Sequence, residues 1–203
     1  MIEIKSIDLG QPVSRTEKVI GFTAANDTRW AGIMDLPTHG QLLLNPNNHT
    51  DLYIIQGELI EDTSLTYATG TFLGRDMNAT LNAGPNGARL FKYQDSNVIS
   101  SNHTTVIPSQ LNWREGGAVG MKVASLINLP HELMLVSWSH DTRMRFHLHP
   151  QGEEIFVLRG ELHDQHGRYP AGTWQRLHPE TGHAPYSETD TLILLRNGHL
   201  PPQ

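Results

Sequence analysis

The apolar segments of the chain are short, and turn-forming residues bound each of them. They are residues 42–44, 52–55, 119–126, 133–138, 155–158 and 191–195. None shows the sustained period of 3.6 residues that marks an amphipathic helix. The 18 Gly and 12 Pro are distributed along all 203 residues. Many short strands joined by turns are therefore expected, which predicts an all-β sandwich or barrel.

An internal repeat appears when Gly57 is aligned with Gly160. The first copy is DLYIIQGELIEDTSLTYATGTF, and the second is EIFVLRGELHDQHGRYPAGTW. Both contain an apolar strand, Gly-Glu-Leu, a polar turn, a tyrosine, and Gly-Thr followed by an aromatic residue. The match predicts two similar β domains in tandem, residues 1–105 and 106–203, with a boundary near the polar stretch 94–110.

Composition excludes several classes of function. The 15 Lys and Arg against 21 Asp and Glu give a net charge of -6 without a basic block, which argues against nucleic acid as a partner. The absence of cysteine excludes disulfides, thiolate metal sites and cysteine nucleophiles. No apolar run approaches the ~20 residues of a membrane helix, and the N-terminus lacks the apolar region of a signal peptide. We therefore expect a soluble cytoplasmic protein.

The segment RFHLHPQGEE, residues 145–154, carries the chemistry. Side chains alternate between the faces of a strand, so His147 and His149 point to the same side. The turn PQG returns the chain and brings Glu153 back beside the two imidazoles. His183, in the Gly/Pro-containing segment HPETGHAP, is the fourth candidate. Three neutral imidazoles and one carboxylate form a borderline N/O ligand set for a divalent first-row metal.

Other titratable groups near this motif are interpreted differently. Glu154 has the opposite parity to Glu153, so we expect it to point outward or to support the ligands from behind. Nine histidines lack the ligand spacing and are interpreted as surface or core residues: His39, His49, His103, His131, His140, His163, His166, His178 and His199. Of these nine, His163 and His178 are the expected neighbours of the ligands.

The stretch HLHPQGEEIFVLRG resembles the first cupin motif, and GTWQRLHPETGH resembles the second. The longer HLHPQGEEIFVLRGELHDQHGRYPAGTWQRLHPETGHAP is similar to the ChrR-like cupins, in which HxHxxGEE precedes D-x-x-G-x-Y-P-A-G. The strong match covers residues 135–196. The resemblance implies two tandem cupin domains, each a double-stranded β-helix (jelly roll). It also implies that His147, His149, Glu153 and His183 bind one divalent Fe, Zn, Mn or Ni ion.

The N-terminal copy departs from this pattern. The positions that match His147, His149 and Glu153 hold Leu44, Pro46 and Thr50, and the match of His183 falls at Thr80 or Leu81. The first domain is therefore predicted to be a degenerate cupin without metal ligands. His49 and Asp51 lie nearby but lack the required parity. The regulators that give the family its name bind a sigma factor through a cysteine-containing zinc domain, so this chain is not expected to inhibit one.

Two functions fit the ligand set. The first is a metal-dependent dioxygenase of an enol, diketone or aromatic ketone, with open metal positions for substrate and O2 and with Glu153 as an alternative general base. Its expected pocket residues are Phe146, Trp174, Met121 and Trp138, with Arg145 or Arg176 at the rim for an anionic substrate. The second is a non-catalytic zinc-binding sensor of a ligand or stress, related to the anti-sigma-factor ChrR cupins, in which a closed tetrahedral site admits no substrate.

The sequence leaves the metal, the substrate and the choice between these functions open. Either function requires a small-molecule ligand, and neither involves nucleic acid or a membrane. The edge strands of tandem cupins favour pairing into a homodimer.

Overall fold

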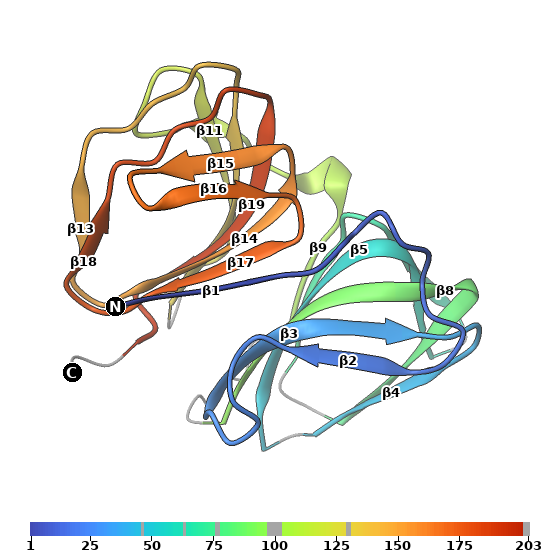
Figure 1. The fold of residues 1–203 in the computed structure, drawn as a ribbon. Coiled ribbons are helices and arrows are strands. Elements are labelled where there is room, and N and C mark those ends of the chain that lie inside the picture. Colours follow the sequence, from blue (N-terminus) through green and yellow to red (C-terminus); the bar gives the residue numbers. More distant parts are fainter. Residues whose placement is uncertain (46, 63, 76–77, 97–102, 129–130, 201–203) are drawn as a thin grey trace. The chain divides into compact units, whose positions relative to one another are not determined.

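The computed structural model describes residues 1–45, 47–62, 64–75, 78–96, 103–128 and 131–200. Two compact units make up the chain (Figure 1). We call Met1–Gly10 with Leu111–Gln203 the C-terminal unit, and Gln11–Gln110 the N-terminal unit. Within the described residues, every regular element is a strand except the 3-10 helix η1 (Pro108–Gln110), and no helix is long and apolar enough to cross a membrane.

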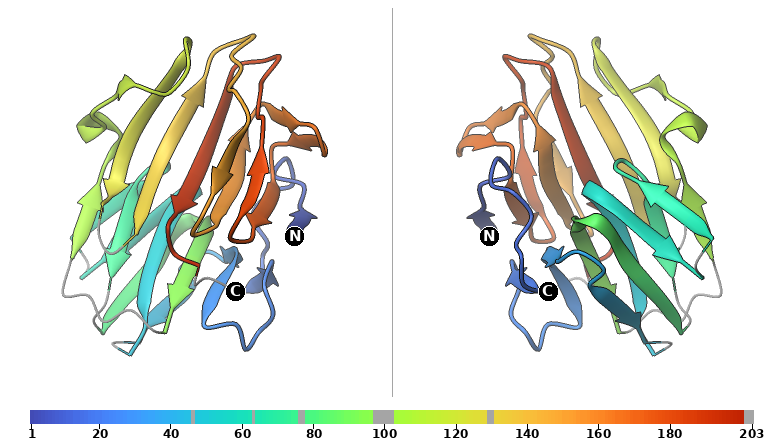
Figure 2. Two further views of the ribbon diagram at one scale, coloured as in Figure 1. Left: turned by 90° about the vertical axis from the view of Figure 1, so that its left-hand side faces the viewer. Right: turned by 90° about the vertical axis from the view of Figure 1, so that its right-hand side faces the viewer.

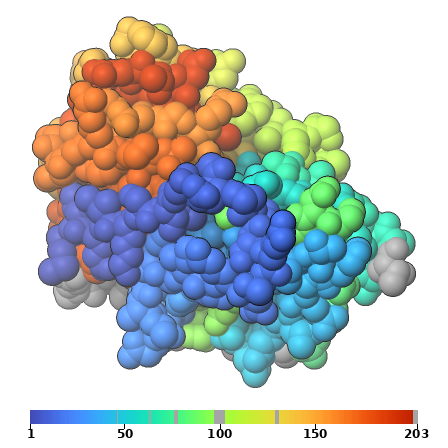
Figure 3. Space-filling view, turned by 45° about the vertical axis from the view of Figure 1, so that its right-hand side comes forward, coloured from blue at the N-terminus to red at the C-terminus, as the bar shows by residue number. Residues whose placement is uncertain are grey.

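The units differ from the predicted domains 1–105 and 106–203 at both ends of the first domain. Strand β1 (Ile2–Ser6) belongs to the C-terminal unit, because it pairs antiparallel with β17 (Thr173–Leu177) at the edge of a sheet. Figure 3 shows the first residues, in the darkest blue, against the orange surface of that unit. The division falls after Gln110 instead of residue 105. Backbone hydrogen bonds make the β1–β17 pairing, and they leave no trace in a residue pattern.

The C-terminal unit contains one large sheet and two small ones. In spatial order the large sheet has β1, β17, β14 (Glu153–Arg159), β19 (Thr191–Asn197), β12 (Glu132–Trp138), β11 (Met121–Ile127) and β10 (Arg114–Glu115). One small sheet pairs β13 (His147–His149) with β18 (Thr181–His183), and the other pairs β15 (Glu161–Asp164) with β16 (Gly167–Pro170). All pairs are antiparallel, and Figure 2 shows the large sheet from two sides.

The N-terminal unit is built around two long strands, β5 (His49–Glu61) and β8 (Ala79–Asp95). The main path of its sheet is β2 (Lys18–Gly21), β3 (Arg29–Leu36), β8, β5, β7 (Phe72–Arg75) and β9 (Thr104–Val106). Strand β4 (Gln41–Leu44) pairs with β8, and β6 (Leu65–Ala68) pairs with β5. Both long strands change partners along their length. Strand β5 pairs with β6, β7 and β8, and β8 pairs with β3, β4 and β5.

Each unit has its own apolar core. In the C-terminal unit the core side chains come from the large sheet and from β15 and β16: Met121, Val136, Trp138, Ile155, Val157, Leu162, Tyr169, Leu177 and Ile193. In the N-terminal unit they include Leu36, Leu52, Ile54, Leu59, Leu73, Leu81 and Leu90. Alternate residues of β14 contribute to the core of the C-terminal unit, which leaves Glu154 and Phe156 on the opposite face of the sheet.

The repeat seen in the sequence corresponds to a shared backbone bend. Gly57 and Gly160 have φ of +80° and +77°, in the left-handed region that only glycine adopts readily. Gly160 separates β14 from β15, and Gly57 lies at a register shift between β5 and β8. A Cβ atom on Gly160 would lie 2.5 Å from the carbonyl oxygen of Asp190, so the position requires glycine for space as well as for conformation.

Replacing Gly160 with Ala should therefore destabilise the C-terminal unit by about 2 kcal/mol or more, because it adds left-handed strain to a backbone clash. The denaturation midpoint in urea, followed by tryptophan fluorescence, measures the loss. Gly167→Ala is the matched control, since its Cβ would have no neighbour closer than 3.6 Å. Equal losses in the two variants would contradict this account of the bend.

Candidate metal centre

The pairing of β13 with β18 builds the centre of the site. His147 lies directly opposite His183 in the register, and His149 lies opposite Thr181. After β13 the chain turns tightly, with Gly152 at φ +69° and its N–H donating to the carbonyl of His149 at 3.1 Å. This turn returns the chain into β14, which starts at Glu153. The turn therefore brings the Glu153 carboxylate back toward the imidazoles of His149 and His183, as predicted.

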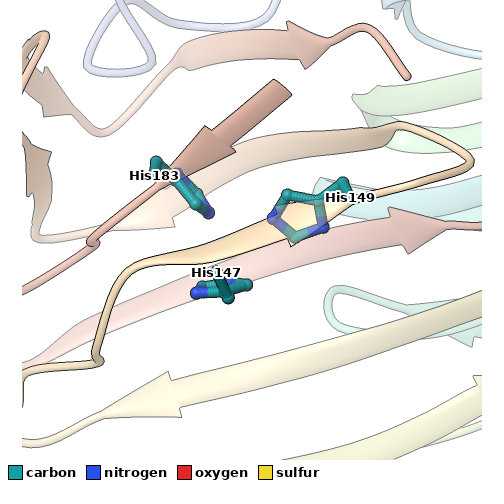
Figure 4. A group of neighbouring side chains, drawn as sticks. All are labelled: His147, His149 and His183. Carbon is teal, nitrogen blue, oxygen red and sulfur yellow. The ribbon is translucent and has the colours of Figure 1, made fainter. Parts of the chain in front are cut away.

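Three imidazoles gather at this point (Figure 4). The ring centroids are 4.8 Å apart for His147 and His149, 5.0 Å for His147 and His183, and 5.1 Å for His149 and His183. One potential ligand atom from each ring lies within 4.8 Å of the other two. His149 and His183 are buried, while His147 is partly exposed. A buried group of three histidines could therefore bind a metal ion.

Contacts at the outward ring nitrogen favour one tautomer in two of the rings. Nδ1 of His147 is 3.0 Å from the carbonyl oxygen of Arg145, which can only accept, so Nδ1 carries the proton and Nε2 is left with a free lone pair. Nδ1 of His183 is 3.4 Å from Oδ2 of Asp164, which favours the same tautomer. Such contacts on the far nitrogen are the usual way in which proteins prepare histidine for a metal.

Glu153 lies beside two of the three rings. Its Oε2 is 3.5 Å from Nε2 of His149 and 3.4 Å from Nε2 of His183. The side chain is 4% exposed, and burial raises the pKa of its carboxyl to about 8. The group of side chains that could hold a metal comprises the three histidines and does not include Glu153.

The protonation states suit a cation. Burial, followed by the charges of His183 and His147, lowers the pKa of His149 to about 3, and burial is also the main reason that the pKa of His183 is lowered. Both rings are therefore neutral at pH 7, the form that binds metals. Nε2 of His149 and Oε2 of Glu153 are buried without a hydrogen-bond partner. Buried polar atoms normally have partners, so these two fit a divalent ion as the missing one.

The imidazoles border a cavity of about 300 Å³ inside the C-terminal unit. Met121 and Trp138, both expected in the pocket, line it. The other lining side chains are Val123, Met134, Val136, Met144, Leu148, Ile155, Leu162, Pro185, Ile193, Leu195 and Asn197, besides the three histidines and Glu153. The interior is therefore apolar except at the candidate metal site and at Asn197.

A second, wider hollow of about 770 Å³ shares His147 and Met144 with this cavity. Arg145 and Phe146 line this outer hollow and not the inner cavity. Phe146 is 61% exposed. The two residues therefore lie at the approach to the imidazoles and not against them.

Trp174 and Arg176, the remaining expected pocket residues, line neither space. Their side chains share the outer face of β17, where Arg176 lies over the Trp174 ring and its Nε donates to Oε1 of Glu154 at 2.6 Å. Glu154 is fully buried instead of pointing into solvent. Burial alone would raise its pKa, but His199, Arg176 and Arg196 lower it to about 2.

The histidines expected beside the ligands have other partners. Nε2 of His163 is 2.6 Å from Glu161, and Nε2 of His178 is 2.6 Å from Glu3. Asp164, which was not predicted as a site residue, has its Oδ2 3.4 Å from Nδ1 of His183. A signal was present in the repeat, since an acidic residue follows each aligned glycine by four positions.

The N-terminal unit carries no such group among its described residues. Leu44, the counterpart of His147, pairs with Ala79, so Ala79 and not Thr80 or Leu81 is the counterpart of His183. Thr50 is buried at the position of Glu153, and Pro46 lies outside the described residues. His49 and Asp51 are buried and in contact at 2.8 Å. His49 is thus a buried structural residue.

Known structures resemble the chain over almost its full length. A putative glyoxylate-induced protein from Pseudomonas aeruginosa has a TM-score of 0.74 at 13% identity, covering 89% of this chain and 79% of that one. A putative dioxygenase from Nostoc punctiforme has a TM-score of 0.73 at 10% identity, covering 100% and 81%. Salicylate 1,2-dioxygenase from Pseudaminobacter salicylatoxidans has 0.67 at 10%, covering 92% and 78%. At these identities the likeness concerns the fold alone.

Residues 101–201 match the family described as the ChrR cupin-like domain. No curated protein sequence is significantly similar to the chain. The fold and the buried histidines define an all-β protein of two tandem cupin domains, as the sequence predicted. The chain is a member of the cupin superfamily, and its C-terminal half is a ChrR cupin-like domain.

Replacing His149 with Ala should abolish stoichiometric metal binding and leave a folded β protein, because the apolar core does not depend on this ring. Metal content after dialysis against a divalent ion, together with circular dichroism, measures both effects. His103→Ala is the control, since His103 is an exposed histidine of the N-terminal unit. Full metal content in His149→Ala would place the ion elsewhere.

If Glu153 is a fourth ligand, metal binding at pH 7 should release about one proton per ion, because burial raises its pKa to about 8 and the carboxyl must ionise to bind a cation. The release should disappear above pH 9, where the carboxyl is already ionised. Isothermal titration calorimetry in buffers of different ionisation enthalpy measures it. In Glu153→Gln no proton should be released at pH 7, and an unchanged release would assign the proton to another group.

Proposed function

We propose that the protein is a metal-dependent dioxygenase of a small organic substrate, namely an enol, a β-diketone or an aromatic ketone. One observation carries the proposal: three imidazoles, two of them buried, and a buried carboxylate border a largely apolar cavity of about 300 Å³. Ligand sites are commonly apolar hollows with a few convergent polar groups, and this cavity has that character.

In this proposal Nε2 of His147, His149 and His183, together with Oε2 of Glu153, hold one divalent ion. Bound Fe(II), Mn(II) or Ni(II) supplies Lewis acidity toward a substrate oxygen and a template that orients O2 beside the substrate. The residues hold this geometry through the β13–β18 register and the contacts on the far ring nitrogens. Metal sites depend on such outer contacts for ring orientation.

Glu153 has a second role in the proposal, as the catalytic base. It lines the cavity and lies within 3.5 Å of two ligand rings, so its Oε2 can accept a proton from a substrate bound at the metal. General bases act at hydrogen-bond distance from the proton that they accept. One carboxylate oxygen cannot hold a cation and accept a proton at the same instant, so Glu153 would act as a base only when it is not holding the ion.

The walls give the substrate its size and polarity. Met121 and Trp138 belong to the apolar inner cavity, whose volume lies at the lower end of ligand sites and favours a compact diketone over a flavonol. Arg145 and Phe146 lie in the outer hollow, where the guanidinium can bind an anionic group of a longer substrate. Support from the named dioxygenases of similar fold is by analogy only, since one fold hosts many activities.

A zinc-binding sensor is the second candidate, and the match to the ChrR cupin-like domain favours it. Three histidines and a glutamate can complete the tetrahedral coordination that zinc adopts in structural sites, which leaves no position for a substrate. The cupin domain would then bind its small-molecule ligand without catalysing a reaction of it. The same residues serve both candidates, so the metal decides between them.

The test is to purify the protein without a metal-affinity tag, determine its metal, and measure oxygen uptake with β-diketones, enols and flavonols. With iron, manganese or nickel, we expect substrate-dependent oxygen consumption that is fastest for compact diketones and absent in His149→Ala. Stoichiometric zinc as purified, with no oxygen uptake in any metal form, would reject the dioxygenase and favour the sensor.

A further inference from the structure

Asp164 ends β15, and three donors hold one of its two carboxylate oxygens. The hydroxyl of Tyr169 donates to Oδ1 at 2.7 Å, the N–H of His166 at 2.7 Å, and the N–H of Gly167 at 3.2 Å. Burial and the neighbouring carboxylate raise the pKa of Tyr169, so the phenol stays protonated and donates. Because three donors converge on Oδ1, the orientation of the carboxylate is determined.

The second oxygen, Oδ2, is left facing a candidate ligand. It lies 3.4 Å from Nδ1 of His183, whose opposite nitrogen, Nε2, lies 3.4 Å from Oε2 of Glu153. Asp164 is 7% exposed, and Tyr169 and His183 are each 2% exposed. Tyrosine, aspartate, histidine and the candidate metal position thus form one chain through the buried interior of the unit.

The N-terminal unit contains the same acid–tyrosine pair without the histidine. The hydroxyl of Tyr67 donates to Oε2 of Glu61 at 2.7 Å, and Glu61 follows Gly57 by four residues, as Asp164 follows Gly160. Nη2 of Arg75 donates to the same oxygen at 3.0 Å. In this unit the tyrosine-held carboxylate therefore balances a buried guanidinium instead of supporting an imidazole.

We propose that Asp164, held by Tyr169, is a positioning residue that keeps the proton of His183 on Nδ1 and turns Nε2 toward the metal. The inference rests on the metal site of the proposed function and adds residues outside the predicted ligand set. A carboxylate on the far nitrogen fixes the tautomer and raises the basicity of the ligating nitrogen. The pair thus makes His183 a stronger ligand than an unsupported imidazole.

Asp164→Asn gives the sharpest test, because the donors at Oδ1 determine how the amide must lie. Its oxygen takes the place of Oδ1, so its NH2 group faces Nδ1 of His183 and favours the proton on Nε2, the nitrogen that must bind the ion. We expect metal affinity to fall by about 100-fold, the upper end of losses for such outer contacts. Competition of Zn(II) with a chromophoric chelator measures it.

Tyr169→Phe removes one of the three donors and leaves the carboxylate, so it should lower the affinity by about 10-fold or less. Asp164→Glu should restore part of the affinity, because glutamate makes the same tyrosine contact in the N-terminal unit. In the Co(II)-loaded protein, the paramagnetically shifted N–H proton resonance of His183 should persist in Asp164→Glu and vanish in Asp164→Asn. A merely structural role would not move this signal.

Glu61→Gln and Tyr67→Phe are the matched controls, because they disturb the same pair in the unit without candidate ligands. They should lower the thermal midpoint and leave metal affinity unchanged. Wild-type affinity in both Asp164→Asn and Tyr169→Phe would overturn the positioning role, and if the first variant does not fold, wild-type affinity in Asp164→Glu and Tyr169→Phe together with loss of the shifted N–H resonance would do so. Failure of the wild-type protein to bind any ion, or full binding by His149→Ala, would instead reject the metal site itself.

Discussion

The antiparallel pairing of β13 with β18 is the interaction on which the site depends. It sets His147 opposite His183, and the alternation of side chains along β13 adds His149 on the same side. The tight turn at Gly152 then brings Glu153 to within 3.5 Å of two rings. Displacing β18 by one residue would turn the His183 side chain to the opposite face, so the site exists in one register only.

Both units share the same backbone bend and acid–tyrosine pair, but they differ in the side chains at the positions of the candidate metal ligands. Each has a glycine with positive φ at the aligned bend, an acidic residue four positions after that glycine, and a later tyrosine that donates to this acid. Where one unit has His147 facing His183, the other has Leu44 facing Ala79. Polar side chains converge in one unit, whereas the N-terminal unit neutralises its buried acid internally with Arg75.

Local patterns in the sequence predicted the strands and the candidate ligands. They did not predict which face of a buried strand points to the cavity or which distant residues come into contact. Trp174 and Arg176 were expected in the pocket but lie on the other face of β17. All five residues of that strand are buried, so alternation of apolar and polar residues could not tell the inner face from the outer one. Asp164 was missed because its contact with His183 appears only when the end of β15 lies beside β18.

The sequence by itself determined the all-β class, the tandem repeat and the residues able to bind a metal, because turn chemistry, side-chain alternation and spacing are local properties. Tertiary structure alone decided that β1 joins the C-terminal unit, which face of β17 is interior, and which carboxylate lies beside His183. These features arise from backbone hydrogen bonds between distant strands. Every residue except proline offers the same donor and acceptor to such bonds, so the sequence carries little record of the partner.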